Sequence, residues 1–319
     1  MDIPALETQS DADAIRLEAR RLGIEKNLLE LHTYGITIVP PETMGTPELT
    51  ERLRDAILRV MGERHGMEVP EDWKSFSGVW GGPQTWGYLF EDDAFVELAL
   101  HPVNLCLARF LCGRSMVLQG TPSLIKTAAG TMDPRTQKYG GDGHLGLHCD
   151  LPGAPSPIPE YAQLCNLSYL LSDYDGPEDG PTVVVPGSHR FGRIPRTDEA
   201  EWWKEGAPVE PISLYGKAGS LVVWPGTLWH GSRPRTKEGM RITLPYIYSR
   251  SYLEPIQPWH EMVKENDNAK MLEKFPELGE LLGLWHPYPV DEDGPMGAKD
   301  PLHAEGNARM IDAGDNIYR

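Results

Sequence analysis

Two segments of the chain carry residues that could hold one metal ion together. In GDGHLGLHCDLPG at 141–153, His148 and Asp150 lie two positions apart. Residues i and i+2 of a strand point to the same face, so a histidine nitrogen and a carboxylate could reach one ion. In SLVVWPGTLWHGS at 220–232, His230 follows a β-rich run and a Pro-Gly turn. Two histidines with one carboxylate are the ligand set of non-haem Fe(II) oxygenases, which leave coordination positions open.

His144 is a rival ligand, because it lies four residues before His148. That spacing suits two ligands on a helix, but GGDGHLG has four glycines in seven residues and is a poor helix. In an extended chain four residues span roughly 13 Å, which is too far for two imidazoles on one ion. We therefore exclude His144 from the ligand set. The remaining histidines outside the motifs are expected at the surface or in packing: His32, His65, His101, His260, His286 and His303.

A ferrous centre needs two extra electrons to activate oxygen, and a 2-oxo acid can supply them if its remote carboxylate is bound. Arginine suits a carboxylate better than lysine, because it donates two parallel hydrogen bonds. Arg241 opens an expected strand, and Ser232 could add a hydroxyl donor. For Arg241 alone, a salt bridge on a strand face is an equal alternative. Arg250 is a rival, whereas Arg233 and Arg235 lie in an apparent loop tip and are expected to be solvated.

The fold class expected from the sequence is mainly β with flanking helices. After residue 114, no long helix pattern separates the short β-rich runs, which are bounded by Gly, Pro, Asn or Asp. An antiparallel sandwich or barrel-like jelly roll suits such runs better than a parallel sheet. Before them, helices are predicted over about 10–23 and from Thr46-Pro47 to Gly66, with a short strand within 35–42. The β-rich runs are 116–129, 163–172, 182–189, 220–226 and 241–252.

We expect a single domain over residues 1–319. Residues 1–114 would form a mostly helical flank and lid, 115–250 the jelly-roll core, and 251–319 a C-terminal extension. The segment 152–159 carries four prolines directly after the first ligand pair. Such a stiff loop cannot join a central strand, and it is equally consistent with a lid or with a plain surface connector.

Composition narrows the class of protein. The formal net charge of −17 over 319 residues, without a basic stripe, disfavours nucleic-acid binding. The sequence contains no run of eighteen apolar residues, so we expect no membrane-spanning helix. The N-terminal residues do not resemble a secretory signal. Four cysteines without a CxxC spacing favour a reducing cytoplasm over a disulfide framework or a structural zinc site. The sequence does not reveal the oligomeric state.

Three motifs in order resemble the phytanoyl-CoA dioxygenase family of Fe(II)- and 2-oxoglutarate-dependent oxygenases. They are the HxD pair at 148–150, GPTVVVPGSHR at 180–190, and WHGSRPRTKEGMR at 229–241. The spacing from His230 to Arg241 in the third motif matches the family without a gap, and it is the most specific part of the resemblance. The resemblance covers roughly residues 115–250, together with the GITIVPPE strand at 35–42.

The resemblance implies a double-stranded β-helix, a cupin-like jelly roll, in which His148, Asp150 and His230 hold iron. It also implies that 2-oxoglutarate is the co-substrate and O2 the oxidant. Arg241 and Ser232 would bind the distal carboxylate of 2-oxoglutarate. Three further residues lie at positions that line the pocket in the family: Lys126, Asn166 and Thr182. Asn166 stands where a relative has an aromatic residue.

Asp150 bears on the type of reaction. Halogenating relatives replace this carboxylate with a small residue, so its presence implies hydroxylation, desaturation or another oxidation. Cys149 should point away from the metal by strand alternation. In the PGSH motif, His189 is expected to fix a turn.

The expected substrate is a small metabolite or natural product, since no basic cluster suggests a site for the phosphates of coenzyme A. The segment GVWGGPQTWGYLFEDD at 78–93 could form a lid whose Trp80, Trp86 and Tyr88 contact it. Packing of these aromatics against the core is an equal alternative. Two other functions stay open, namely a metal-dependent hydrolase and a non-catalytic ligand-binding barrel on the same fold.

Overall fold

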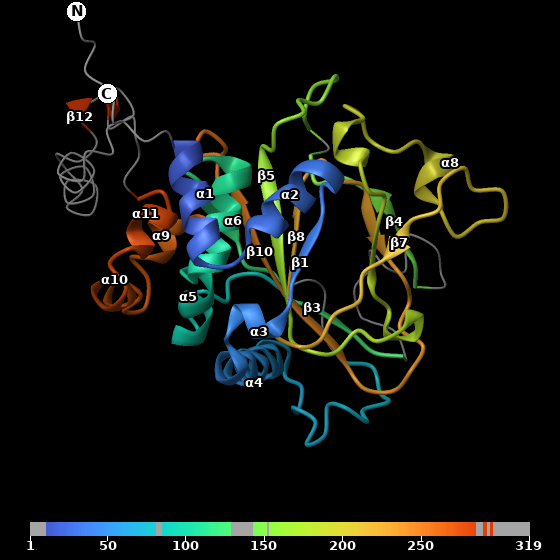
Figure 1. The fold of residues 1–319 in the computed structure, drawn as a ribbon. Helices are drawn as coiled ribbons and strands as arrows, with labels where there is room; N and C mark the ends of the chain where they lie inside the picture. Colours follow the sequence, from blue (N-terminus) through green and yellow to red (C-terminus); the bar gives the residue numbers. More distant parts are fainter. Residues whose placement is uncertain are drawn as a thin grey trace, which may run out of the picture.

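The protein is described here from a computed structural model. It describes residues 11–80, 85–128, 143–151 and 153–284, together with the backbone of two short paired strands further on, β11 (Val290–Asp291) and β12 (Gly294–Pro295). His286 and His303 lie outside these residues. Figure 1 shows sheets at the centre and right of the molecule, with most helices to the left and below.

The larger sheet is antiparallel throughout and has the order β1–β8–β5–β10–β2, with β3 also paired to β10. Strand β10 is the longest and lies beside three others, so it ties the sheet together. The β-rich runs that form this sheet are far apart in the sequence but pair directly with one another. Its strands are β1 (Thr37–Val39), β2 (Val117–Gly120), β3 (Leu124–Lys126), β5 (Leu164–Leu170), β8 (Leu221–Pro225) and β10 (Arg241–Ser249).

The smaller sheet is also antiparallel and has the order β4–β9–β6–β7. A set of buried apolar residues fills the space between the two sheets, including Val222 and Leu170 from the larger one and Val184 from the smaller one. Antiparallel sheets with flanking helices, as predicted from the sequence, are confirmed. The strands are β4 (Leu145–His148), β6 (Thr182–Val184), β7 (Ile212–Ser213) and β9 (His230–Ser232).

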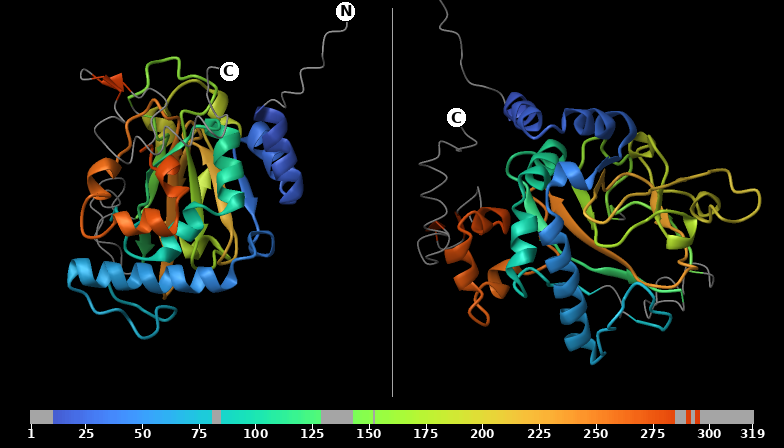
Figure 2. Two further views of the ribbon diagram at one scale, coloured as in Figure 1. Left: turned by 90° about the vertical axis from the view of Figure 1, so that its left-hand side faces the viewer. Right: turned by 60° about the horizontal axis from the view of Figure 1, so that its bottom comes forward.

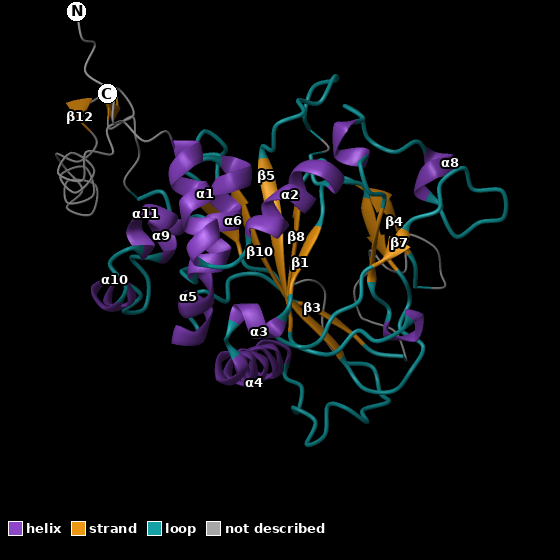
Figure 3. Ribbon diagram, viewed as in Figure 1, coloured by secondary structure: helices purple, strands orange, loops and turns teal. Residues whose placement is uncertain are grey.

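Helices cover the other face of the larger sheet, as Figure 3 shows by colour. Alternation along β5 explains the two faces: Cys165, Leu167 and Tyr169 enter the core shared with the helices, whereas Leu170 faces the smaller sheet. In Figure 2 the long helix α4 runs lengthwise beneath the strands. The helices are α1 (Asp11–Arg21), α2 (Glu25–Tyr34), α3 (Pro41–Met44), α4 (Pro47–His65), α5 (Asp93–Ala99), α6 (Pro102–Cys112), α8 (Thr197–Ala200), α9 (Trp259–Met262), α10 (Ala269–Lys274) and α11 (Leu278–Leu281).

The start of α4 agrees with the sequence in position but not in its cap. The helix begins at Pro47, yet the Thr46 hydroxyl makes no capping hydrogen bond. It lies 2.7 Å from the hydroxyl of Tyr169, which also contacts Thr50. A tertiary partner from the sheet has therefore replaced the local capping bond expected of a threonine at this position.

Within the described ranges, no single helix is long and apolar enough to cross a membrane. Helices α5 and α6 meet that test only as a pair, which is bent by 50° at the break.

Candidate metal centre

The two predicted histidines face each other on neighbouring strands of the smaller sheet. His148 ends β4, His230 opens β9, and the two are directly opposite in the antiparallel register. Their ring centroids lie 4.2 Å apart. Between β4 and β9 the backbones come so close that a Cβ on Gly231 would meet the Leu145 carbonyl oxygen at 2.4 Å. The glycine of the HGS motif is therefore required by this close approach.

Asp150 completes the group just beyond the end of β4. Its backbone N–H donates to the Gly226 carbonyl at 2.8 Å, which holds the residue next to the loop before β9. Its carboxylate oxygens lie 3.7 Å from His148 Nε2 and 3.4 Å from His230 Nε2. One ligand atom from each of the three residues lies within 4.8 Å of the others. In the part of the chain that the structure describes, no other group of His, Cys, Asp and Glu side chains is arranged this way.

Hydrogen bonds from the backbone orient both imidazole rings. His148 Nδ1 lies 2.9 Å from the Gly146 carbonyl, and His230 Nδ1 lies 2.9 Å from the Leu228 carbonyl. Since a carbonyl oxygen only accepts, each Nδ1 carries the proton and each Nε2 keeps a lone pair for a metal. Burial lowers the pKa of His230 to about 4, with a further lowering by His148 that Asp150 partly offsets. The His230 imidazole is therefore neutral at neutral pH, which is the form that binds metals.

Four of the predicted co-substrate residues lie on β9 and on three further strands, β3, β6 and β10. Ser232 is two positions after His230, roughly 7 Å along β9. Its hydroxyl accepts a hydrogen bond of 2.6 Å from Lys126 Nζ, and Lys126 is opposite Arg241 in the β3–β10 register. Thr182 faces Ser232 from the other neighbouring strand. The structure thus brings these four residues to one side of the three metal-ligand candidates.

Arg241 is fully buried, yet the described residues offer its guanidinium only neutral acceptors. It donates to the Tyr174 hydroxyl at 2.8 Å and to the Gly180 carbonyl at 2.7 Å, and Thr243 lies at 3.4 Å. Among the described residues it makes no ion pair, so the salt bridge weighed from the sequence is not formed there. Its burial without an acid leaves a cation that a ligand carboxylate could satisfy.

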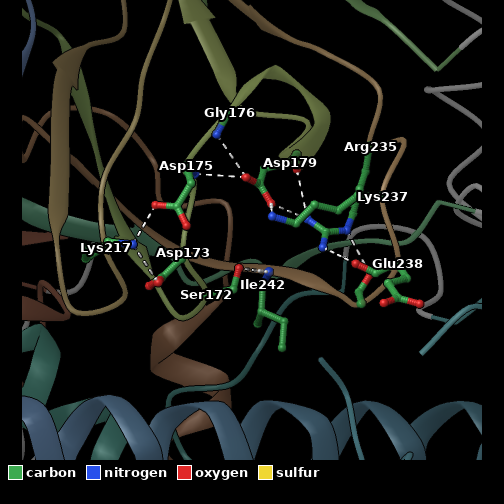
Figure 4. Close-up of polar contacts among 11 residues, drawn as sticks. Ser172, Asp173, Asp175, Gly176, Asp179, Lys217, Arg235, Lys237, Glu238 and Ile242 are labelled. Carbon is green, nitrogen blue, oxygen red and sulfur yellow. Dashed lines mark hydrogen bonds and ion pairs between the residues drawn. The ribbon is translucent and has the colours of Figure 1, made fainter. Parts of the chain in front are cut away.

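Arg235 does not follow the expectation of a solvated loop tip. Its side chain is buried and bonds Asp179 at 3.1 Å as well as the Gly239 carbonyl at 2.8 Å, as Figure 4 shows for the surrounding cluster. Arg233 donates to the Ser213 hydroxyl and lies 4.9 Å over the Trp202 ring. The prediction was wrong for Arg235 because its partner is 56 residues away in the sequence.

A sequence profile of the phytanoyl-CoA dioxygenase (PhyH) family matches residues 39–243, which is well over half of the chain. This chain belongs to the phytanoyl-CoA dioxygenase family. The match confirms the family that the three motifs predicted. It also begins at β1, ahead of the β-rich runs, so the family region includes most of the helical flank.

Individual relatives of the family are distant. An uncharacterised protein of Mycobacterium tuberculosis is 28% identical over 132 residues, covering 41% of this chain and 44% of that protein. Dioxygenase af480 of Aspergillus fumigatus is 26% identical over 206 residues, covering 62% of this chain and 58% of its own. The chain therefore spans about half the length of the curated relatives it matches.

Among solved structures, HygX from Streptomyces hygroscopicus with nickel and 2-oxoglutarate bound superposes with a TM-score of 0.55 at 18% identity. The match covers 72% of this chain and 88% of HygX. A second HygX structure, which also holds hygromycin B, gives a TM-score of 0.51. At this identity the likeness shows a shared fold.

Two of the three aromatics of the predicted lid pack in the hydrophobic core. Trp80 is buried and donates to the Glu68 carbonyl, and Tyr88 is buried with its hydroxyl 2.7 Å from Ser123. Both pack in the core under the helices, which fits the packing alternative. Trp86 is half-buried, with its ring against Gly120. Residues 81–84 of this segment lie outside the described residues.

Other motif residues also have defined places. His144 is packed between Trp202 and Trp203, apart from the ligand group. Cys149 packs with Trp229 on the opposite side of the strand from the ligands, and burial raises the pKa of its thiol. His189 is buried in a short 3-10 turn at Ser188–Arg190.

Sequence reasoning missed Trp224 and Tyr174. The Trp224 ring lies 5.2 Å from the His230 ring, and the Tyr174 hydroxyl accepts from Arg241. Alternation along β8 would have placed Trp224 on the inner face with Val222. No local signal pointed to Tyr174, because it lies in the loop after β5.

Proposed function

We propose that this chain is an Fe(II)- and 2-oxoglutarate-dependent dioxygenase that hydroxylates an unactivated C–H bond of a small-molecule metabolite or natural product. The observation that carries the proposal is the convergence of His148, Asp150 and His230, with both Nε2 atoms free to bind a metal. Membership of the phytanoyl-CoA dioxygenase family supports the same chemistry.

The donor set fits ferrous iron. Two neutral imidazole nitrogens and one carboxylate bind Fe(II) from one side and leave positions for other ligands. Backbone carbonyls already hold both rings in the required tautomer, so little reordering would accompany metal binding. When bound, iron and 2-oxoglutarate would supply, with O2, the oxidising power for C–H cleavage, and succinate and CO2 would be released.

The residues beyond the metal ligands fit the distal carboxylate of 2-oxoglutarate. Among the described residues Arg241 is a buried cation without an acid partner. Lys126 is opposite it on the neighbouring strand β3, and the Lys126 ammonium donates to Ser232 of β9 in the smaller sheet. A carboxylate there would form charge-assisted hydrogen bonds, which are the strong ones in proteins. Thr182 would border the same slot through its pairing with Ser232. These side chains would orient the co-substrate toward the metal.

The arrangement of the two sheets supports a double-stranded β-helix as the fold. Two facing antiparallel sheets with a shared apolar filling are the expected form of a double-stranded β-helix, and the likeness to HygX supports it. We assign the jelly-roll core to residues 115–250 of one domain, with residues 1–114 as flank and 251–319 as extension.

The substrate assignment rests on weaker observations. HygX has been solved with hygromycin B, which supports a small molecule as the substrate class. Trp86 is the aromatic of the predicted lid that keeps a partly exposed face, so it is the candidate for a substrate contact. Asp150 occupies the carboxylate position, which favours hydroxylation over halogenation.

An anaerobic titration of the metal-free chain tests the proposal. Fe(II) is added first and 2-oxoglutarate second, and visible absorbance is followed. A weak charge-transfer band that requires both additions is expected, because it reports chelation of ferrous iron by the 2-oxo acid. Asp150→Ala is the matched control, and it should lose the iron and the band together.

Other outcomes separate the alternatives. Bound iron without a band would remove 2-oxoglutarate as co-substrate and would favour a metal-dependent hydrolase. Failure to bind iron at all would favour a non-catalytic barrel. A band of normal strength in the Asp150→Ala variant would contradict the ligand assignment.

A further inference from the structure

Asn166 makes a contact that its family position does not explain. It lies on β5 and is buried, with 5% of its surface exposed. Its Nδ2 lies 2.6 Å from Oδ2 of Asp150. In the registers of the larger sheet, Asn166 is opposite Ile247 of β10 on one side and Trp224 of β8 on the other. A buried amide thus stands between two apolar neighbours and reaches the candidate metal ligand.

The direction of this hydrogen bond follows from chemistry. An ionised carboxylate only accepts, so the amide must present its NH2 group to Asp150. The reverse orientation would set two lone-pair-bearing oxygens 2.6 Å apart. A short bond between an amide donor and a charged acceptor is the charge-assisted type, and leaving either group unpaired when buried is costly.

Asp150 needs such a partner because its own strand does not fix it. The residue follows the last position of β4, and its side chain keeps 31% of its surface exposed. Its backbone is held by the hydrogen bond to Gly226, but this bond leaves the carboxylate free to rotate. Asn166 belongs to the middle of a paired strand, so it offers a rigid support for that group.

We propose that Asn166 is a positioning residue that holds one oxygen of Asp150 and leaves the other for the metal. The inference rests on the proposed metal site, but it differs from the co-substrate contact expected from the family position. Carboxylates that ligate metals are commonly supported by such hydrogen bonds, whose loss weakens metal binding about 10–100-fold. Asn166 therefore contributes to metal affinity and to the geometry of the site without touching the metal.

The experiment measures metal binding by the full chain without 2-oxoglutarate. Mn(II) affinity is obtained by calorimetry, and Co(II) gives a visible d–d spectrum that reports ligand geometry. Asn166→Leu and Asn166→Ala both remove the donor, although one fills the space and the other leaves a cavity. Each should weaken Mn(II) binding about 10–100-fold and change the Co(II) spectrum.

Ser168→Ala is the matched control. Ser168 lies two positions further along β5, on the same face and similarly buried. Two residues of a strand span roughly 7 Å, so its short side chain is displaced along β5 from the Asn166 contact with Asp150. This variant should bind Mn(II) as the unchanged chain does. Thermal unfolding of each metal-free variant shows whether it is folded, so a loss of affinity common to the Leu and Ala variants cannot come from packing alone.

Wild-type Mn(II) affinity and an unchanged Co(II) spectrum in both folded Asn166 variants would overturn the inference. If metal binding were unchanged but 2-oxoglutarate bound more weakly, Asn166 would instead be a co-substrate contact. The proposed function fails on a different result, which is the absence of the charge-transfer band in the unchanged chain.

Discussion

Two buried arginines, six residues apart, differ in their hydrogen-bond partners. Arg235 bonds the carboxylate of Asp179 at 3.1 Å and the carbonyls of Gly239 and Glu238. Arg241 has hydroxyl and carbonyl acceptors but no acid among the described residues. Their burial is similar, with 7% and 2% of the surface exposed. The difference therefore lies in the partner and not in the depth.

The surroundings of Arg235 form a closed network. Asp179 accepts from the backbone N–H groups of Asp175 and Gly176 and also bonds Lys237 at 2.8 Å. In Figure 4 these donors converge on the one carboxylate and join the loop after β5 to the loop before β10. A buried charge with this many partners inside its own chain is explained by structure alone.

Arg241 has no such explanation. A buried guanidinium without an acid costs free energy unless another negative group reaches it. Lys126, opposite it on β3, adds a second cation, and that lysine donates to the hydroxyl of Ser232 in the smaller sheet. The contacts of Arg235 join the two loops. The contrast supports the proposal that Arg241 binds the carboxylate of the co-substrate.

The largest effect on stability is expected from Arg235→Met. It leaves the nearly inaccessible carboxylate of Asp179 with Lys237 and two backbone donors. Breaking a buried pair from one side costs about 3–5 kcal/mol, and the remaining lysine favours the lower end, about 3 kcal/mol. Urea unfolding of the metal-free chain measures this loss. Unchanged stability would show that Lys237 alone suffices, and weakened binding of 2-oxoglutarate would move Arg235 into the site.

Arg241→Met should have the opposite effect, a loss of affinity for 2-oxoglutarate without a loss of stability. The affinity for 2-oxoglutarate, read from the charge-transfer band, should fall about 100-fold, which corresponds to about 2.7 kcal/mol. Stability of the ligand-free chain should be unchanged or higher, because a buried cation without an acid is replaced by an apolar side chain of similar length. Arg241→Lys keeps the charge but not the paired donors and should lose less affinity. A large loss of stability with normal affinity would make Arg241 structural.

The sequence predicted the two histidines of the candidate site because both lie on strands. His148 of β4 and His230 of β9 are directly opposite, and Asp150, two residues after His148 and just beyond β4, joins the same group. The β-rich runs likewise became strands where they were expected. Local patterns are sufficient here because the period of a strand fixes which side chains share a face.

Long-range pairing is what the sequence could not reveal. Nothing in the loop that carries Arg235 points to Asp179, and nothing near Thr46 points to Tyr169, which is 123 residues away. Trp80 and Tyr88 are likewise buried by contacts outside their own segment. In each case a tertiary partner decided the role of the residue.

The smallest expected effect is a difference in the pH dependence of stability, and it separates the two arginines once more. Burial alone would raise the pKa of Asp179, but hydrogen bonds from Lys237 and from the backbone of Asp175 and Gly176 hold it below its ordinary value of 3.8. The unfolded chain therefore takes up this proton first as the pH falls, so the stability that Asp179 contributes is present above about pH 4 and lost below it. Unfolding free energies between pH 5 and pH 3 should fall less steeply in Asp179→Asn than in the unchanged chain. Arg241→Met should keep the wild-type slope, because that arginine has no acid partner among the described residues whose pKa it could lower. A flattened slope in this variant would mean that the two arginines share one network.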